Sequence, residues 1–305
     1  MNEPSAAHLP AEAPQRNRTM LGIGLMMLGF LFFAVSDAIA KLLTHDLHPF
    51  QVVWFRQLGL FSVGLWLLAS RGLPILRTRR IGFQIARGVV AAGSSACFVF
   101  AISFVPLADA VAVSFVAPFI VTVLGALILR EHVGVRRWMA VTVGFIGTLI
   151  VIRPGLGLFH PAILLVIVAA GLFAARQILS RILGPLDKTV TTIAYTSAAS
   201  VAVLTIPTLL VWHWPSGPEA MVLIFFLAAT AGAGEVMVIR ALELAQAVTV
   251  APLQYTMIVW STVLGWAIFA QLPDQWTLAG AAIIMASGLY TLHRERVIAR
   301  QQERK

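Results

Sequence analysis

Ten long apolar stretches constrain the fold of this chain more than any other feature of its 305 residues. A helix that crosses a bilayer needs about 20 predominantly apolar residues, and each stretch comes close to that length or exceeds it. Lipid accepts only helices and closed barrels, and these stretches lack the alternation of a barrel strand. We therefore predict an all-α integral membrane protein with ten transmembrane helices. The stretches cover residues 20–42, 51–70, 83–103, 109–129, 138–153, 160–180, 189–211, 219–240, 247–268 and 277–293.

The composition excludes a soluble protein of this size, because 59% of the residues are hydrophobic and 11% are charged. Soluble domains carry about 25% charged residues. The net charge of +9 raises the question of a nucleic-acid partner, but the basic residues are spread over short loops and are not interleaved with aromatic residues. We expect no nucleic-acid partner, and the lipid bilayer is the expected surrounding. The single cysteine, Cys97, excludes an intrachain disulfide.

The sequence carries a repeat whose two copies keep a constant offset of 140 residues. The string Thr122-Val123-Leu124-Gly125, for example, recurs unchanged as Thr262-Val263-Leu264-Gly265. Identity between the copies is low, so the argument for duplication rests on the constant offset. Each copy holds an odd number of stretches, so the second must enter the bilayer upside down, which is the architecture of secondary transporters. We predict two inverted five-helix repeats, at residues 20–153 and 160–293.

The Lys and Arg residues of the connecting loops fall on one side of the predicted membrane. Most of the 22 Lys and Arg residues lie in residues 1–19, after the second, fourth, sixth and eighth stretches, and in the basic tail at 294–305. The positive-inside rule therefore puts both termini in the cytoplasm, in agreement with an even number of spans. Residues 1–19 are polar and rich in Pro and Ala, which predicts a disordered cytoplasmic N-terminus. A cleaved signal peptide is the alternative, but its apolar run would exceed the usual length of about 7–15 residues.

Motifs of common catalytic and nucleotide-binding sites are absent from the sequence. It contains no Walker A string, no G-x-G-x-x-G after a strand, no H-E-x-x-H and no paired CxxC. A single-chain pump driven by ATP is thereby excluded. We expect no cofactor, no metal site and no enzymatic activity.

Five ionisable residues inside the predicted spans are the main candidates for function. A charge at the centre of a spanning helix costs about 2.5–3.5 kcal/mol on insertion scales, so these residues must be paired, hydrated or close to the interface. The arginines among them lie near span ends, where a long side chain reaches the headgroups. Topological anchoring and a functional role both stay open for them. The five residues are Asp37, Arg56, Arg87, Arg176 and Glu235.

The two carboxylates have short side chains that cannot reach the interface, so a role in binding or proton relay is the default interpretation. Glu235 follows Ala231-Gly232-Ala233-Gly234, small residues that permit close helix approach and leave room beside the carboxylate. Its repeat equivalent is Ser95. The alternative is that Glu235 pairs with an arginine and holds two helices together. Asp37 precedes Lys41 by four residues, the spacing of an ion pair within one helix, which favours a structural role for Asp37.

The fourth and ninth stretches each contain a proline, Pro118 and Pro252, which frees backbone carbonyls to line a cavity or to act as a hinge. A polar and an aromatic residue lie nearby at matching positions of the two copies. These pairs are Ser114 with Phe115, and Gln254 with Tyr255. They could cradle an organic solute from both sides of a pseudo-twofold axis, although aromatic residues in an apolar helix are also ordinary packing residues.

Small residues mark the last helix of each copy. Gly144 and Gly147 lie in the fifth stretch, and Gly280 and Gly288 lie in the tenth. Such residues allow close helix packing, either within one bundle or across a dimer. Both a monomer and a homodimer therefore stay open.

The chain resembles the drug/metabolite transporter superfamily, in its ten-helix EamA-domain branch, over nearly all of residues 20–293. The resemblance rests on the repeat and on four local strings. These are Phe33-Ala34-Val35-Ser36-Asp37-Ala38 followed by Lys41, His48-Pro49-Phe50-Gln51-Val52-Val53-Trp54-Phe55-Arg56, Leu129-Arg130-Glu131, and Ala251-Pro252-Leu253-Gln254-Tyr255 leading to Leu264-Gly265-Trp266. The second copy departs from the pattern, because Gln271 stands where such proteins often carry a Glu. Glu131 is therefore not expected to act as half of a symmetric pair.

The resemblance implies a carrier of the bacterial inner membrane that works by alternating access around a cavity between the repeats. Members of the family carry amino acids, nucleosides, vitamins, S-adenosylmethionine or toxic organic compounds. We therefore expect a secondary active transporter of a small polar or amphipathic metabolite, with a proton as the candidate coupling ion. A broad exporter of toxic compounds is the alternative within the fold. A non-transporting membrane protein and a membrane-embedded enzyme are the alternatives from other classes. The candidate substrate-binding residues are Asp37, Arg56, Ser95, Ser114, Arg176, Glu235, Gln254 and Tyr255.

Overall fold

The structure, a computed structural model, describes residues 12–130, 134–153, 160–183, 186–246 and 250–302. Every regular element in these ranges is a helix, as predicted. Residues 1–11 of the predicted disordered segment, Glu131 of the family resemblance and the last residues of the tail lie outside the described ranges. The helix of the first stretch begins at Glu12, within the segment predicted to be disordered. A helix that already crosses the bilayer extends easily in this way, because each added residue also adds a hydrogen bond.

All ten predicted stretches have a helical counterpart, although two of them are interrupted. Among the described residues, seven segments are long and apolar enough to cross a membrane, and α6, η2 with α11, and α12 lie in the other stretches. The α-helices are α1 (Glu12–Leu43), α2 (Pro49–Arg71), α3 (Ile81–Ile102), α4 (Leu107–Ser114), α5 (Ala117–Ile128), α6 (Val135–Ile152), α7 (Ile163–Leu183), α8 (Thr189–Leu210), α9 (Gly217–Leu244), α11 (Thr256–Phe269) and α12 (Gln275–Gln302). The described residues also form two 3-10 helices, η1 (Leu73–Leu76) and η2 (Ala251–Tyr255).

The two interruptions fall in the fourth and ninth stretches, close to the prolines. The fourth stretch breaks between α4 and α5, and Pro118 lies in the first turn of α5. In the described part of the ninth stretch, η2 contains Pro252 and leads directly into α11. Proline has no backbone N–H to donate and clashes with the preceding turn, so regular helix is lost at both places. As a result, Ser114 and Phe115 lie at the end of α4, and Gln254 and Tyr255 lie at the end of η2.

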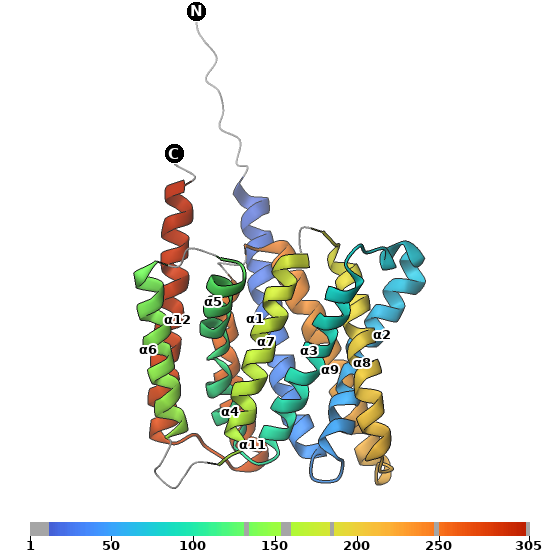
Figure 1. Ribbon diagram of the computed structural model, residues 1–305. Coiled ribbons are helices and arrows are strands. Elements are labelled where there is room, and N and C mark those ends of the chain that lie inside the picture. Colours follow the sequence, from blue (N-terminus) through green and yellow to red (C-terminus); the bar gives the residue numbers. More distant parts are fainter. Residues whose placement is uncertain (1–11, 131–133, 154–159, 184–185, 247–249, 303–305) are drawn as a thin grey trace, which may run out of the picture.

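The helices form one upright bundle in which α4 and α5 continue in the same direction as two parts of one span (Figure 1). The closest pairs are α1 with α9, α3 with α7, α6 with α12, and α2 with both α8 and α9. Because the connections alternate between the two ends, α1 begins and α12 ends at the same end of the bundle (Figure 1).

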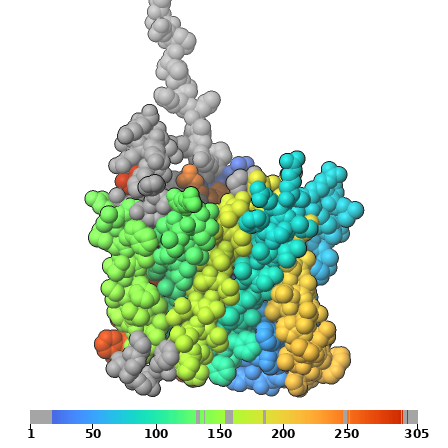
Figure 2. All heavy atoms as spheres, viewed as in Figure 1, coloured from blue at the N-terminus to red at the C-terminus, as the bar shows by residue number. Residues whose placement is uncertain are grey.

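The outer surface of the bundle is apolar. Figure 2 shows a face on which α7, α3 and α8 lie side by side. Large apolar side chains on these helices are exposed, among them Leu164 on α7, Ile85 on α3 and Leu209 on α8. An extended apolar exterior of this kind is the surface that a bilayer requires.

Small residues let the helix backbones approach closely, as the sequence predicted. On α6 and α12, a Cβ added at Gly147 would lie 3.0 Å from the carbonyl oxygen of Gly280, and the Ser287 hydroxyl donates to the carbonyl of Ala140 at 2.6 Å. The last helices of the two halves therefore pack against each other within one chain.

The tightest approach joins α2 to α9, and it predicts a sharp effect of a single methyl group. A Cβ at Gly59 would overlap the backbone carbonyl of Ala228, which cannot rotate away. Gly59→Ala should therefore destabilise the protein by about 1–3 kcal/mol through overpacking. Unfolding of the protein in detergent measures the effect. Gly171→Ala on α7 is the matched control, because nothing lies within 4 Å of its added Cβ, and it should be neutral or slightly stabilising. An equal loss of stability in both variants would contradict the close approach.

Candidate functional site

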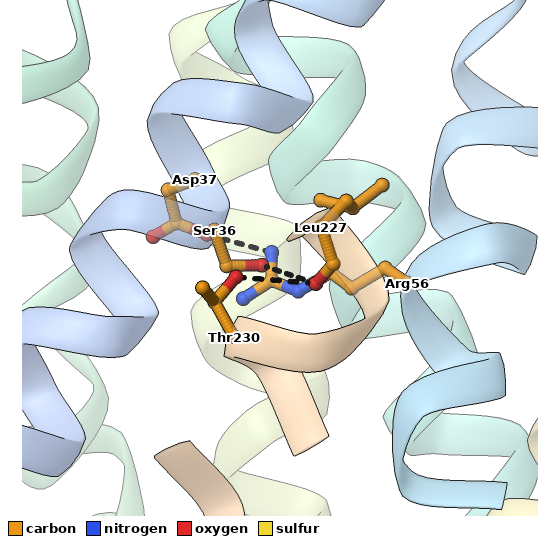
Figure 3. A network of polar contacts seen from close by, with 5 residues as sticks. All are labelled: Ser36, Asp37, Arg56, Leu227 and Thr230. Atoms are coloured by element: carbon orange, nitrogen blue, oxygen red, sulfur yellow. Dashed lines mark hydrogen bonds and ion pairs between the residues drawn. The ribbon is translucent and has the colours of Figure 1, made fainter. Parts of the chain in front are cut away.

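One cluster of buried polar groups joins α1, α2 and α9, and Figure 3 shows its members. The Arg56 guanidinium on α2 reaches across to α1, and its Nη1 donates to Oδ1 of Asp37 at 2.6 Å. The Ser36 hydroxyl donates to the Leu227 carbonyl at 3.5 Å. The Thr230 hydroxyl donates to the Phe226 carbonyl at 2.6 Å and also lies 3.3 Å from the Leu227 oxygen. The side chains of Asp37 and Arg56 are 2% and 13% exposed. We call the five residues drawn in Figure 3 the outer cluster.

The interpretation of Asp37 and Lys41 as an ion pair within α1 is wrong. Asp37 is paired with Arg56 instead, and the ammonium of Lys41 donates to the carbonyl of Val105 at 2.6 Å and to Oε1 of Gln271 at 3.0 Å. It also lies 5.1 Å from the centre of the Phe269 ring. Lys41 is in the last turn of α1, so oxygen acceptors at the end of the bundle are within its reach. Arg56, for its part, does not extend to the headgroups, because the Asp37 carboxylate holds it inside.

A second cluster lies between α3, α7, α8 and α9. The Nε of Arg87 on α3 donates to the Ser180 hydroxyl on α7 at 2.8 Å, and its Nη1 donates to the Thr196 hydroxyl on α8. The charges of Arg176 on α7 and of Glu235 on α9 both act on Arg87, the first by repulsion and the second by attraction. Arg87, Arg176, Glu235, Ser180 and Thr196 form the inner cluster. Sequence reasoning placed Arg87 inside a span but not among the binding residues, because its distance from the span end also suits an interfacial anchor.

Glu235 is half-buried on α9, where two glycines in the preceding turn bring other helices close. A Cβ at Gly232 would lie 2.9 Å from the Gly59 carbonyl on α2, and one at Gly234 would lie 3.1 Å from the Gly29 carbonyl on α1. Within the described residues, no ion pair or hydrogen bond holds the Glu235 carboxylate. The small residues thus serve helix packing, and the carboxylate is left available for another partner.

The aromatic residues of the interrupted stretches meet between the two halves of the chain. The rings of Phe115 and Tyr255 have centroids 5.0 Å apart and an interplanar angle of 52°. The Tyr255 hydroxyl packs against the backbone of Gly288 on α12. Ser114 is turned back onto its own helix, since its hydroxyl donates to the Val111 carbonyl at 2.7 Å. Ser95 is half-buried on α3. The Phe115–Tyr255 pair thus joins the two stretches, whereas Ser114 is used locally.

Charged residues gather at the end of the bundle opposite the start of α1, and sequence reasoning missed this group. Arg153 after α6 forms an ion pair with Asp274 just before α12. Burial would raise the pKa of Asp274, but hydrogen bonds from Thr277 and Arg153 outweigh it and hold the pKa below its usual value. Asp109 in the first turn of α4 lies near Lys41 and Thr277, and its Oδ1 is buried without a hydrogen-bond partner in the described part of the chain. The signal was Asp109 itself, an acidic residue at the edge of an apolar stretch.

The sequence matches a known protein family and several named transporters. Residues 20–153 match the EamA-like transporter family. A protein of Rickettsia felis named S-adenosylmethionine uptake transporter is 29% identical over 278 residues, which cover 91% of this chain and 94% of the relative. A riboflavin transporter of Brucella anthropi is 29% identical and covers 75% of this chain and 82% of the relative. The pseudopaline exporter CntI of Pseudomonas aeruginosa is 26% identical and covers 87% of this chain and 94% of the relative.

A solved crystal structure has the same fold, with a TM-score of 0.62 at 17% identity over 92% of this chain and 99% of the other. The apolar helical bundle and the named relatives define the class of the protein, which is a multi-pass membrane transporter. The resemblance of the sequence to the drug/metabolite transporter superfamily is thereby confirmed.

Proposed function

We propose that this protein is a secondary active transporter that carries a small polar or amphipathic metabolite across the bacterial inner membrane by alternating access between two inverted repeats. The observation that carries the proposal is the inner cluster. It holds two guanidinium groups and a carboxylate that is free of ion pairs within the described residues. Unpaired charge inside a membrane is costly, and it marks the path of a solute or an ion.

Symmetric contacts support the inverted repeats, since several packing contacts recur after the 140-residue shift. Gly59 packs on Ala228. The equivalent residues after the shift are Ala199 and Gly88, and they also pack together. In the same way, the contact of Gly147 with Gly280 corresponds to the contact of Ser287 with Ala140.

The shift also maps Phe115 onto Tyr255, its own contact partner, so these rings lie on the proposed pseudo-twofold axis. In agreement, α1 and α7, the first helices of the two halves, run in opposite directions (Figure 1).

The charges favour a cationic or zwitterionic metabolite, and S-adenosylmethionine is the first candidate because of the Rickettsia relatives. Its ammonium and sulfonium groups match Glu235, and its carboxylate matches the arginines. Glu235 is also the better candidate for proton coupling, because the Asp37 carboxylate is already engaged by Arg56. The proposed orientation puts both termini in the cytoplasm, on the side where the basic loops gather.

The test is flux through the purified protein in proteoliposomes. We expect saturable uptake of radiolabelled S-adenosylmethionine that unlabelled solute competes away and that a pH gradient increases. Protein-free liposomes are the control. The absence of saturable flux, in either direction, for S-adenosylmethionine and for a panel of amino acids, nucleosides and vitamins would contradict the proposal. Flux that is driven only outward would assign the protein to export, the direction named for the pseudopaline relative.

A further inference from the structure

The arginines of the inner cluster have donor capacity that the protein does not use. A guanidinium offers five N–H donors. Arg87 spends two donor nitrogens on the hydroxyls of Ser180 and Thr196. Arg176 donates no hydrogen bond within the described residues, and its Nε is buried without a partner. Several N–H groups of this pair are therefore available to an acceptor that the described chain does not supply.

The charges of the cluster also call for an acceptor. Arg87 and Arg176 repel each other, and Glu235 is the carboxylate that attracts Arg87. Two positive charges and one negative charge leave an excess of positive charge inside the bundle. The outer cluster cannot compensate, because Asp37 and Arg56 neutralise each other. An anionic group beside the two arginines would remove the repulsion.

The surroundings hold the two guanidinium planes in place. The Arg176 guanidinium lies over the Phe173 ring, 5.0 Å from its centroid. Ser180 donates its own hydroxyl proton to the Arg176 carbonyl at 2.8 Å, so its lone pairs remain to fix Arg87 Nε. Planar guanidinium groups fixed in this way match a carboxylate, which accepts two parallel hydrogen bonds.

The repeat makes this arrangement specific to one half of the protein. The 140-residue shift relates Arg176 to Ser36 and Arg87 to Leu227. In the outer cluster, the Ser36 hydroxyl donates to the Leu227 carbonyl, so the equivalent groups satisfy each other (Figure 3). The basic pair therefore has no counterpart across the proposed axis.

We propose that Arg87 and Arg176 form a subsite for the carboxylate of an organic solute, with Glu235 placed to receive the cationic group of the same molecule. This inference rests on the proposed function, because it assigns a substrate class to the same site. The solute would be an amino acid or an amino-acid derivative, bound with its carboxylate toward α3 and α7 and its cationic group toward α9.

The test compares each acid with its decarboxylated form on the full-length protein. The pairs are S-adenosylmethionine with decarboxylated S-adenosylmethionine, and methionine with 3-(methylthio)propylamine, and affinity is read from ligand-induced shifts in thermal unfolding. The wild type should bind the acid about 10- to 100-fold more tightly, the range for a hydrogen bond to a charged group. Arg176→Gln should remove this preference without lowering the affinity for the amine. Arg240→Gln, at an exposed arginine paired with Glu243, should leave it intact.

Each outcome decides between the subsite and the transport proposal. Equal affinity for acid and amine in the wild type, or a preference that persists in both Arg176→Gln and Arg87→Gln, would overturn the subsite, even if the protein transports a solute. Discrimination between acid and amine without flux would overturn the proposed function and support the subsite. If Arg176→Gln does not fold, Arg87→Gln and Arg176→Lys carry the same comparison. The arginine variants are also compared in two lipids. If they lose the preference for the acid only in nanodiscs that contain phosphatidylglycerol, and not in phosphatidylcholine, the arginines bind a lipid phosphate and the inference is overturned.

Discussion

Glu235→Gln is expected to reduce transport of a cationic or zwitterionic solute by about 10- to 100-fold while the amount of inserted protein stays unchanged. The glutamine keeps the shape of the side chain but loses the charge-assisted contact to the solute, or the site that takes up the coupling proton. Because the described residues leave the carboxylate without an ion pair, its removal should cost little stability. Initial uptake rates in proteoliposomes, normalised to inserted protein, measure the effect.

The control for this variant is Glu243→Gln on the same helix, where the carboxylate is exposed and pairs with Arg240. Transport by this control should match the wild type. The two roles of Glu235 separate by mechanism. If the variant no longer binds the solute and its downhill flux is reduced, Glu235 contacts the solute. If the variant binds the solute normally but a pH gradient no longer drives accumulation, Glu235 takes up the coupling proton. Wild-type rates in Glu235→Gln would make the carboxylate structural.

Breaking the buried pair between Asp37 and Arg56 is expected to give the largest loss of stability. Asp37→Asn or Arg56→Gln alone should cost about 3–5 kcal/mol, because each leaves an uncompensated charge inside the bundle. The double variant should recover most of that loss, because no charge then remains to be solvated. Unfolding of the wild type, the two single variants and the double variant in the same detergent gives the coupling energy between the two residues. Additive losses in the double variant would show that the two residues act independently.

The apolar stretches predicted the helices, because a backbone in lipid has few ways to satisfy its hydrogen bonds. The repeat offset put Phe115 and Tyr255 at matching positions of the two copies, but it did not predict that their rings contact each other. Side-chain partners were harder to predict. Lys41 is four residues from Asp37 and Arg56 is 19 residues away, yet the tertiary packing of α1 on α2 favours the distant partner.

The partners of Arg87 were hard to predict for the same reason. Its position in the sequence fits an interfacial anchor as well as a buried donor, and the choice depends on hydroxyl groups that other helices supply, Ser180 on α7 and Thr196 on α8. The spacing of residues within one stretch carries no information about such partners. Asp109 was missed for a related reason, because its neighbours Lys41 and Thr277 come from both ends of the chain.

The packing of α6 against α12 has a mechanical consequence. These helices are fastened at three levels, by Gly147 on Gly280, by the Ser287 hydroxyl on Ala140, and by the ion pair of Arg153 with Asp274. A pair joined along its length acts as a fixed post, because sliding or opening would break all three contacts together. In the proposed alternating access, the two halves therefore cannot rock as independent bodies. The motion that would expose the inner cluster to one side or the other comes from the remaining helices, which turn against a post to which each half contributes one helix.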